Sequence, residues 1–332
     1  MRAGWEVLRR LLPLMLVAAA AAETPEELIE AGHWKRARAL VEAGPGCVER
    51  NPAGCFLLSQ IRNAFGDRKT PLPLAEKAVS LDGQVGRFHR QLAEALGVEA
   101  QSANAIQQFF LARRFKKEIE LALGLDGRDL QAQEDLMEFY LLAPVVAGGD
   151  RGRAGEVARG IARTDASRGF LAEARLSEFD KRAERAAAML RQAVDADGAS
   201  YRARIGLARF SLGAGHEDAA EAARQAGEAT RIDPGRVDGY VILAEADAMR
   251  GDGSGLDAVV ARATENVPDD LAPYYRAAAR LLAARKDLAR ARRYLEKYLS
   301  QEPEGNEPTL GEAHWKLGDV LEKLGELKRA GN

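Results

Sequence analysis

The sequence has very little of the residue types that build metal centres and disulfide frameworks. It contains two cysteines and four histidines in 332 residues. The histidines are far apart along the chain, and metal ligands must converge within a few ångströms, so we expect no metal site and no cofactor. The sequence also lacks the glycine-rich, Walker, Gly-x-Ser-x-Gly and His-Glu-x-x-His patterns of nucleotide-binding proteins, hydrolases and metalloproteases. We therefore predict a protein that is not an enzyme.

The chain also lacks an excess of charge, a long apolar run and a strand pattern. Its 48 basic and 50 acidic residues give a net charge of −2, which disfavours a sequence-independent nucleic-acid binder. The apolar run Leu11 to Ala22 has 12 residues, whereas a membrane-spanning helix needs about 20, so we predict no integral membrane span. No segment alternates apolar and polar residues with β-branched enrichment, so strands are not expected.

The amino-terminal residues are typical of an export signal. Arg2, Arg9 and Arg10 precede the apolar run, which closes with an alanine triplet before Glu23. This pattern predicts a signal peptide over residues 1–22 with cleavage after Ala22, and hence a periplasmic or secreted protein. Arginine outnumbers lysine by 37 to 11, as in bacteria with GC-rich genomes. The alternative interpretation is an uncleaved amphipathic stretch or a wrongly assigned start.

A helix-ending motif recurs along most of the chain. The segments 229–234, 263–268 and 298–303 each end in proline, and these prolines are 34 and 35 residues apart. Upstream copies end in Gly83, Gly127 and Gly198 instead, and one copy, ending at Ala166, has neither residue. Proline blocks helix continuation, and we expect the glycines to stop a helix by adopting the left-handed conformation. An Asp or Glu precedes several of these stops and favours the turn.

Between successive stops lie two apolar-periodic stretches of about 13 residues. They are divided by short polar or glycine-containing turns, for example at Gly66-Asp67, Lys286-Asp287 and Gly325-Glu326. This pattern predicts an antiparallel helix pair repeated about eight times over residues 23–332, with the last unit incomplete. We expect the resulting array to be elongated.

The spacing of large and small residues within the units resembles the tetratricopeptide repeat (TPR) family. The copies that match best have Tyr240, Leu243, Ala244 and Asp247; His314, Leu317, Gly318 and Leu321; and Tyr275, Ala279, Leu282, Ala291 and Pro303. The resemblance implies an all-α fold, a right-handed superhelical solenoid of antiparallel helix pairs. It also implies that the first helix of each pair lines a concave groove that binds a peptide or a partner protein.

The family's groove-facing positions fall on six charged residues of this sequence. They are Glu138, Arg175, Arg209, Glu245, Arg276 and Arg280. Both signs of charge occur, so they do not indicate a uniformly acidic or basic ligand. No Asn stands at these positions, so the resemblance does not support a role in clamping a peptide carboxylate. The alternative is that these side chains are simply solvated and the groove is empty.

These observations favour a non-catalytic protein–protein interaction scaffold of the cell envelope, with a protein or peptide as its partner. The alternative is an accessory or truncated part of a larger envelope enzyme or assembly system whose carboxyl-terminal module is missing. The segment Ala143 to Gly149 stands where a short turn is expected, and the sequence assigns it no purpose.

The two cysteines are eight positions apart, at Cys47 and Cys55, with Pro52 and Gly54 between them. Such a segment can fold back, and an exported protein meets oxidising conditions, so a disulfide is one expectation. The other is that Cys55 occupies a bulky helix position as a small buried hydrophobe while Cys47 remains free.

Overall fold

The computed structural model describes residues 23–48 and 50–330, and the side chains of its last helix as far as residue 325. The predicted signal peptide, residues 1–22, lies outside the described residues. Over the described ranges the chain forms seventeen α-helices and one 3-10 helix, and no strand. The fold is therefore all-α, as the sequence predicts.

Sixteen of these helices pack as eight antiparallel pairs, and a seventeenth follows them. The pairs are α1 (Pro25–Ala31) with α2 (Trp34–Ala43), α3 (Pro52–Ala64) with α4 (Pro71–Leu81), α5 (Gly86–Ser102) with α6 (Ala105–Leu125), α7 (Leu130–Leu142) with α8 (Arg151–Thr164), α9 (Ala166–Phe179) with α10 (Ala183–Ala196), α11 (Tyr201–Ser211) with α12 (Ala219–Ile232), α13 (Val237–Arg250) with α14 (Gly253–Asn266), and α15 (Ala272–Ala283) with α16 (Leu288–Tyr298). The last helix is α17 (Leu310–Ala330).

The pairs are held together by small residues where helices cross and by large residues between units. Ala222, Ala226 and Ala291 have no exposed surface, which lets the backbones approach closely. Tyr240 and Leu295 are also fully buried, and each buried large side chain contributes about 1.5–3 kcal/mol of transfer free energy. The alternation of small and large residues that carries the family resemblance is thus the packing pattern of the solenoid.

Aspartate, rather than glycine, ends most second helices. Asp82, Asp126 and Asp197 each cap a helix in extended backbone conformation, and each carboxylate accepts a hydrogen bond from the N–H two residues later, at 3.0, 3.0 and 2.9 Å. This local bond competes with helix continuation. The expectation that Gly83, Gly127 and Gly198 stop helices by left-handed conformation is wrong, because none of the three is among the glycines with positive φ.

Left-handed residues occur instead at the turns inside helix pairs. Gly32, Gly66 and Gly251 have φ of 92°, 73° and 77° and follow α1, α3 and α13. The division predicted at Gly66-Asp67 is therefore present. At Gly325-Glu326 the prediction is wrong, because α17 runs through both residues to Ala330. A single glycine costs a helix about 1 kcal/mol, and neither proline nor a capping aspartate supplies a stop there.

The segment Ala143 to Gly149 forms a compact loop between α7 and α8. It contains the 3-10 helix η1 (Val145–Ala147), which lies against α6. The N–H of Asp150 donates to the carbonyl of Tyr140 at 2.8 Å, so the loop returns to its starting point. A side chain at Gly149 would meet the carbonyl oxygen of Ala143 at 1.8 Å, so only glycine fits there.

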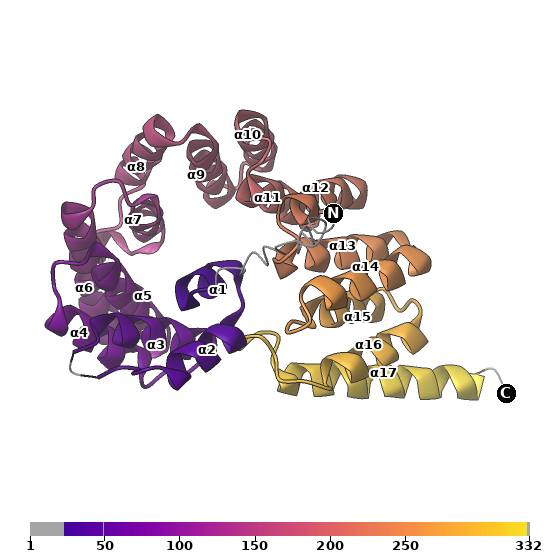
Figure 1. Cartoon of the computed structure of the whole chain (residues 1–332). Helices are drawn as coiled ribbons and strands as arrows, with labels where there is room; N and C mark the ends of the chain where they lie inside the picture. The colour runs from indigo at the N-terminus through magenta and orange to yellow at the C-terminus, as the bar shows by residue number, and fades with distance from the viewer. Residues whose placement is uncertain (1–22, 49, 331–332) are drawn as a thin grey trace, which may run out of the picture.

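The solenoid curves until its two ends meet. Figure 1 shows the first helix of each pair on the inside of the arc, the second helix outside, and α2 against the segment before α17. The contact joins residues that are 236 to 269 positions apart, among them His33 with Asp269 and Lys35 with Glu304. The expectation of an elongated array is wrong: the described chain is a closed ring from which α17 projects.

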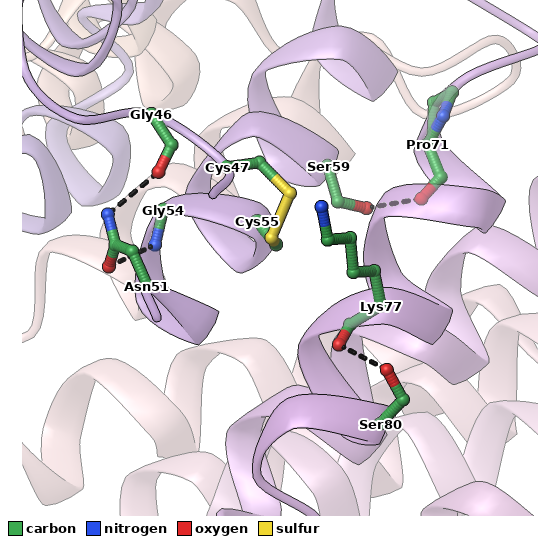
Figure 2. The surroundings of a disulfide bond; sticks show 9 residues. All are labelled: Gly46, Cys47, Asn51, Gly54, Cys55, Ser59, Pro71, Lys77 and Ser80. Atoms are coloured by element: carbon green, nitrogen blue, oxygen red, sulfur yellow. Dashed lines mark hydrogen bonds between the residues drawn. A yellow bond between two sulfur atoms is a disulfide. The ribbon is translucent and has the colours of Figure 1, made fainter. Parts of the chain in front are cut away.

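A disulfide joins the first two helix pairs. Cys47, in the loop after α2, is bonded to Cys55 in the first turn of α3, with Cα atoms 4.2 Å apart (Figure 2). Asn51 organises the loop: its side chain donates to the carbonyl of Gly46 at 2.7 Å and accepts from the N–H of Gly54 at 3.0 Å. Cys55 is also fully buried, but Cys47 is bonded to it, so the alternative that leaves Cys47 free is wrong.

Candidate docking groove

The candidate site is the inner face of the ring along α7, α9, α11, α13 and α15. Each of these helices is the first of its pair, and several begin at a residue that orients them. The side chains of Asp129, Asp165 and Ser200 accept hydrogen bonds from the first turns of α7, α9 and α11. Capping of this kind contributes about 1 kcal/mol per helix. The caps fix where these helices start, and so which side chains face inward.

Three adjoining hollows lie along this face, and together they contain all six predicted groove residues. The hollow between α9, α10 and α11 has a volume of about 740 Å³, with Arg175 and Arg209 in its lining. The next, between α11, α13 and α15, has about 480 Å³, and Arg209, Glu245, Arg276 and Arg280 line it. A smaller one of about 260 Å³, between α7 and α9, is lined by Glu138 and Arg175.

The largest hollow has an apolar floor and a charged rim. Leu171, Leu190 and Phe210 line it, beside Gly206, whose missing side chain lets Leu171 and Leu190 approach the backbone closely. A Cβ at Gly206 would stand 3.3 Å from Leu171. His216 stacks on the Phe210 ring, with centroids 4.2 Å apart.

Most of the predicted residues pair with one another across neighbouring units, and the sequence did not indicate this. Arg175 donates to both oxygens of Glu138 at 2.6 and 2.9 Å, Arg280 donates to Glu245 at 2.9 Å, and Arg209 pairs with Asp238. The carboxylate of Glu134 similarly binds Arg168 and Arg202, both at 2.9 Å. These pairs form a ladder from α7 to α15.

The ladder has a signal in the sequence that could have been found. Glu138 and Arg175 are 37 residues apart, and Glu245 and Arg280 are 35 apart, which is one repeat length. Opposite charges separated by one repeat at groove positions therefore predict a bridge between consecutive helices. Since partly exposed pairs of this kind contribute about 0.2–1 kcal/mol each, the ladder orients side chains more than it stabilises the fold.

Arg276 differs from the other five predicted residues. It is exposed, lies over the ring of Tyr275 at 5.9 Å, and pairs with no carboxylate among the described residues. In the same hollow Asp270 is buried, and burial raises the pKa of this carboxyl to about 6. Among the six predicted groove residues, Arg276 is thus the cation that a ligand can reach without breaking an ion pair between described residues.

The described residues offer no sign of a metal centre or a membrane span. Within residues 23–48 and 50–330, no three His, Cys, Asp or Glu side chains gather closely enough to hold a metal ion. Over the same ranges no helix is long and apolar enough to cross a membrane.

Comparison with known proteins finds similarity in structure only. No family model and no curated protein sequence matches the chain. A tetratricopeptide repeat protein from Parabacteroides merdae is 13% identical and has a TM-score of 0.43, with 82% of this chain and 99% of that one covered. TTC0263, a TPR protein of Thermus thermophilus, is 21% identical with a TM-score of 0.42, covering 60% of this chain and 98% of its own.

A third solved structure, YrrB, is described as a TPR protein with an unusual peptide-binding site. It is 16% identical, covers 60% of this chain and 95% of its own, and has a TM-score of 0.34. All three are TPR proteins, the family that the sequence resembles. At this degree of similarity the likeness does not extend to a ligand or a partner.

Proposed function

We propose that the protein is an interaction scaffold that holds an extended segment of a partner protein along the inner face of the ring. The observation that carries this proposal is the row of three hollows, which contains every groove residue predicted from the sequence. A partner segment would place a bulky apolar side chain in the largest hollow and a carboxylate near Arg276. Apolar anchors with a few polar contacts are the usual basis of such recognition.

We further propose that the protein acts in the bacterial cell envelope. The signal-like pattern of residues 1–22 supports this, as does the disulfide between Cys47 and Cys55, because disulfides persist in oxidising compartments. A mass measurement of protein recovered from the periplasm tests it. A chain that still begins at Met1 would contradict export with cleavage after Ala22.

The experiment that tests the groove is site-specific photo-crosslinking in envelope extract. Benzoylphenylalanine is placed at Arg209, which lines two hollows, and, as a matched control, at Arg231 on the outer helix α12. Both side chains are well exposed, at 62% and 75%. We expect crosslinks to one partner segment from position 209 and none from position 231. Equal crosslinking from both positions would reject the groove as the docking site.

Arg276→Ala supplies a second, independent readout. Because the side chain is exposed and forms no ion pair among the described residues, its loss should change the unfolding free energy by less than about 0.5 kcal/mol. We expect it to weaken capture of the crosslinked partner by about tenfold, the usual cost of losing one charge-assisted contact. Arg231→Ala should capture as well as the wild type, and an equally unaffected Arg276→Ala would remove Arg276 from the site.

A further inference from the structure

The contact that closes the ring is built from charged groups of two distant parts of the chain. We call it the seam: the start of α2 against the loops 267–271 and 299–309. His33 lies 3.0 Å from the carboxylate of Asp269, and Arg38 donates to both oxygens of Glu302 at 3.2 and 2.8 Å. The ammonium of Lys35 donates to the carbonyl of Glu302 at 2.8 Å. The seam is therefore rich in ionic contacts, and its 299–309 segment also lies close to Trp34 and to the turn Ala64–Gly66.

Glu304 is the centre of the seam. Its side chain is 2% exposed, and it accepts a hydrogen bond from the backbone N–H of Lys35 at 2.5 Å. It thereby caps the start of α2, which the flanking residue His33 does not do through its side chain. The second carboxyl oxygen of Glu304 is buried without a hydrogen-bond partner, 3.4 Å from the Lys35 ammonium. A buried and incompletely satisfied carboxylate is costly to ionise.

The loops of the seam also form a wall of the candidate groove. Glu307 and Pro308, in the segment that carries Glu304, line the hollow between α11, α13 and α15. Asp270, next to Asp269, lines the same hollow. Gln301 ties the two loops together by donating to the carbonyl of Asp269 at 2.9 Å. Separating α2 from these loops would thus release a wall of the hollow that contains Arg276.

We propose that the seam is a proton-controlled latch, which holds the ring closed in mildly acidic solution and releases the 299–309 segment as the solution becomes alkaline. The part of this inference that makes the latch a regulator of the groove rests on the proposed function. The opening itself is a property of the free chain and needs no partner.

The direction of the pH effect follows from how closure of the ring changes the pKa of each titratable group in the seam. Burial raises the pKa of Glu304 from 4.5 to about 7. The closed form is thus favoured while Glu304 keeps its proton and loses this advantage as pH rises through about 7. The bond to Asp269 raises the pKa of His33, so the charged pair is also lost as pH rises. Burial raises the pKa of Asp269, but the bond and the charge of His33 outweigh it and lower this pKa, so the pair is also lost in strong acid.

The other charged groups around Glu304 raise or lower its pKa. Lys35 opposes the effect of burial, because its charge favours ionised Glu304, whereas Asp269 and Asp270 disfavour it. Arg38 and Glu302 remain paired throughout this pH range, since the bond to Arg38 lowers the pKa of Glu302. Arg36 on α2 and Glu307 in the segment complete the set near the seam. Glu304 and His33 are therefore the seam groups that change charge near neutrality, and the buried carboxyl of Asp270, with a pKa of about 6, lies beside them.

The test measures the distance between the two ends of the mature chain by electron–electron resonance. Nitroxide labels are attached to cysteines introduced at Leu40 on α2 and Leu321 on α17, both exposed. The native cysteines are joined to each other and do not compete. We expect a short distance to dominate at pH 5.5 and a second, longer distance to replace it as the pH is raised to 8.5.

Two variants in this labelled chain separate the latch from a general pH effect. Glu304→Gln keeps the shape but cannot ionise, so we expect it to stay closed at pH 8.5. Asp135→Asn is the matched control, because burial raises the pKa of Asp135 to about 6 and this residue lies on α7, away from the seam. It should open like the parent chain. A parent distance that does not change between pH 5.5 and 8.5, or opening of Glu304→Gln at the parent's midpoint, would overturn the proposal.

Discussion

At the scale of single residues, the stops between repeats show that aspartate does the work expected of glycine. Asp126 ends α6 in extended conformation, and its carboxylate accepts a hydrogen bond from the N–H of Arg128. Gly127, by contrast, does not have a positive φ, and a Cβ added there would lie 3.5 Å from the nearest carbonyl oxygen, which is an ordinary contact. Gly251 is the opposite case, with φ of 77° and open space around it. The strain of a side chain at Gly251 would therefore come from the backbone alone.

These three positions give a direct stability prediction. Asp126→Ala should lower the unfolding free energy by about 1 kcal/mol through the lost hydrogen bond. Gly251→Ala should cost about 1–2 kcal/mol because of its left-handed conformation, and Gly127→Ala should be neutral or slightly stabilising. Urea denaturation of the three variants checks this. If Gly127→Ala cost more than Asp126→Ala, glycine would after all be the helix stop.

Individual residues also show which features of the fold and the groove could be predicted from the sequence. The stops were visible because proline and Asp-Gly pairs recur at one spacing, and the six groove residues were placed on the inner face by the family's register. The pairing of Lys35 with Glu304 has no periodic signal, since the two lie in non-equivalent positions 269 residues apart. Ring closure depends on small rotations summed over eight units, and no local pattern encodes that sum.

At the scale of elements, the disulfide fixes the junction between the first two helix pairs. It links the loop after α2 to α3, beside a core that contains Leu28, Phe56 and Phe88. The junction therefore does not rely on apolar packing alone. Because α2 also forms one side of the seam, its anchoring on α3 determines where the seam can form.

Free-thiol counting on denatured protein from the periplasm tests the bond. We expect no reactive thiol and an unchanged monomer mass. Cys47→Ser with Cys55→Ser should lower the unfolding free energy by about 2–3 kcal/mol, the value of the chain-entropy model for so short a loop. Two reactive thiols in the wild-type protein would contradict both the bond and export to an oxidising compartment.

At the scale of the whole molecule, the seam connects helices that otherwise have no common neighbour. Glu302→Ala removes the bidentate partner of Arg38 without touching any helix core. We expect amide exchange in both α2 and α16 to speed up together, although neither helix carries the substitution. Glu228→Ala on the outer face of α12, where Glu228 pairs with Arg231, is the control and should change exchange in α12 only. If amide exchange accelerated only in the substituted segment, the seam would not couple the stability of α2 to that of α16.

Closure also changes the kind of cooperativity that the molecule has. An open array of repeats behaves as a line of units, each stabilised by its neighbours, and its two end units fray independently. Joining the ends removes that independence: one contact, made across nearly the whole chain, gives both terminal pairs a neighbour on each side. The terminal pairs can then unfold only after the seam breaks. The seam is therefore the weakest point of the ring, and its stability depends on the pH of the solution.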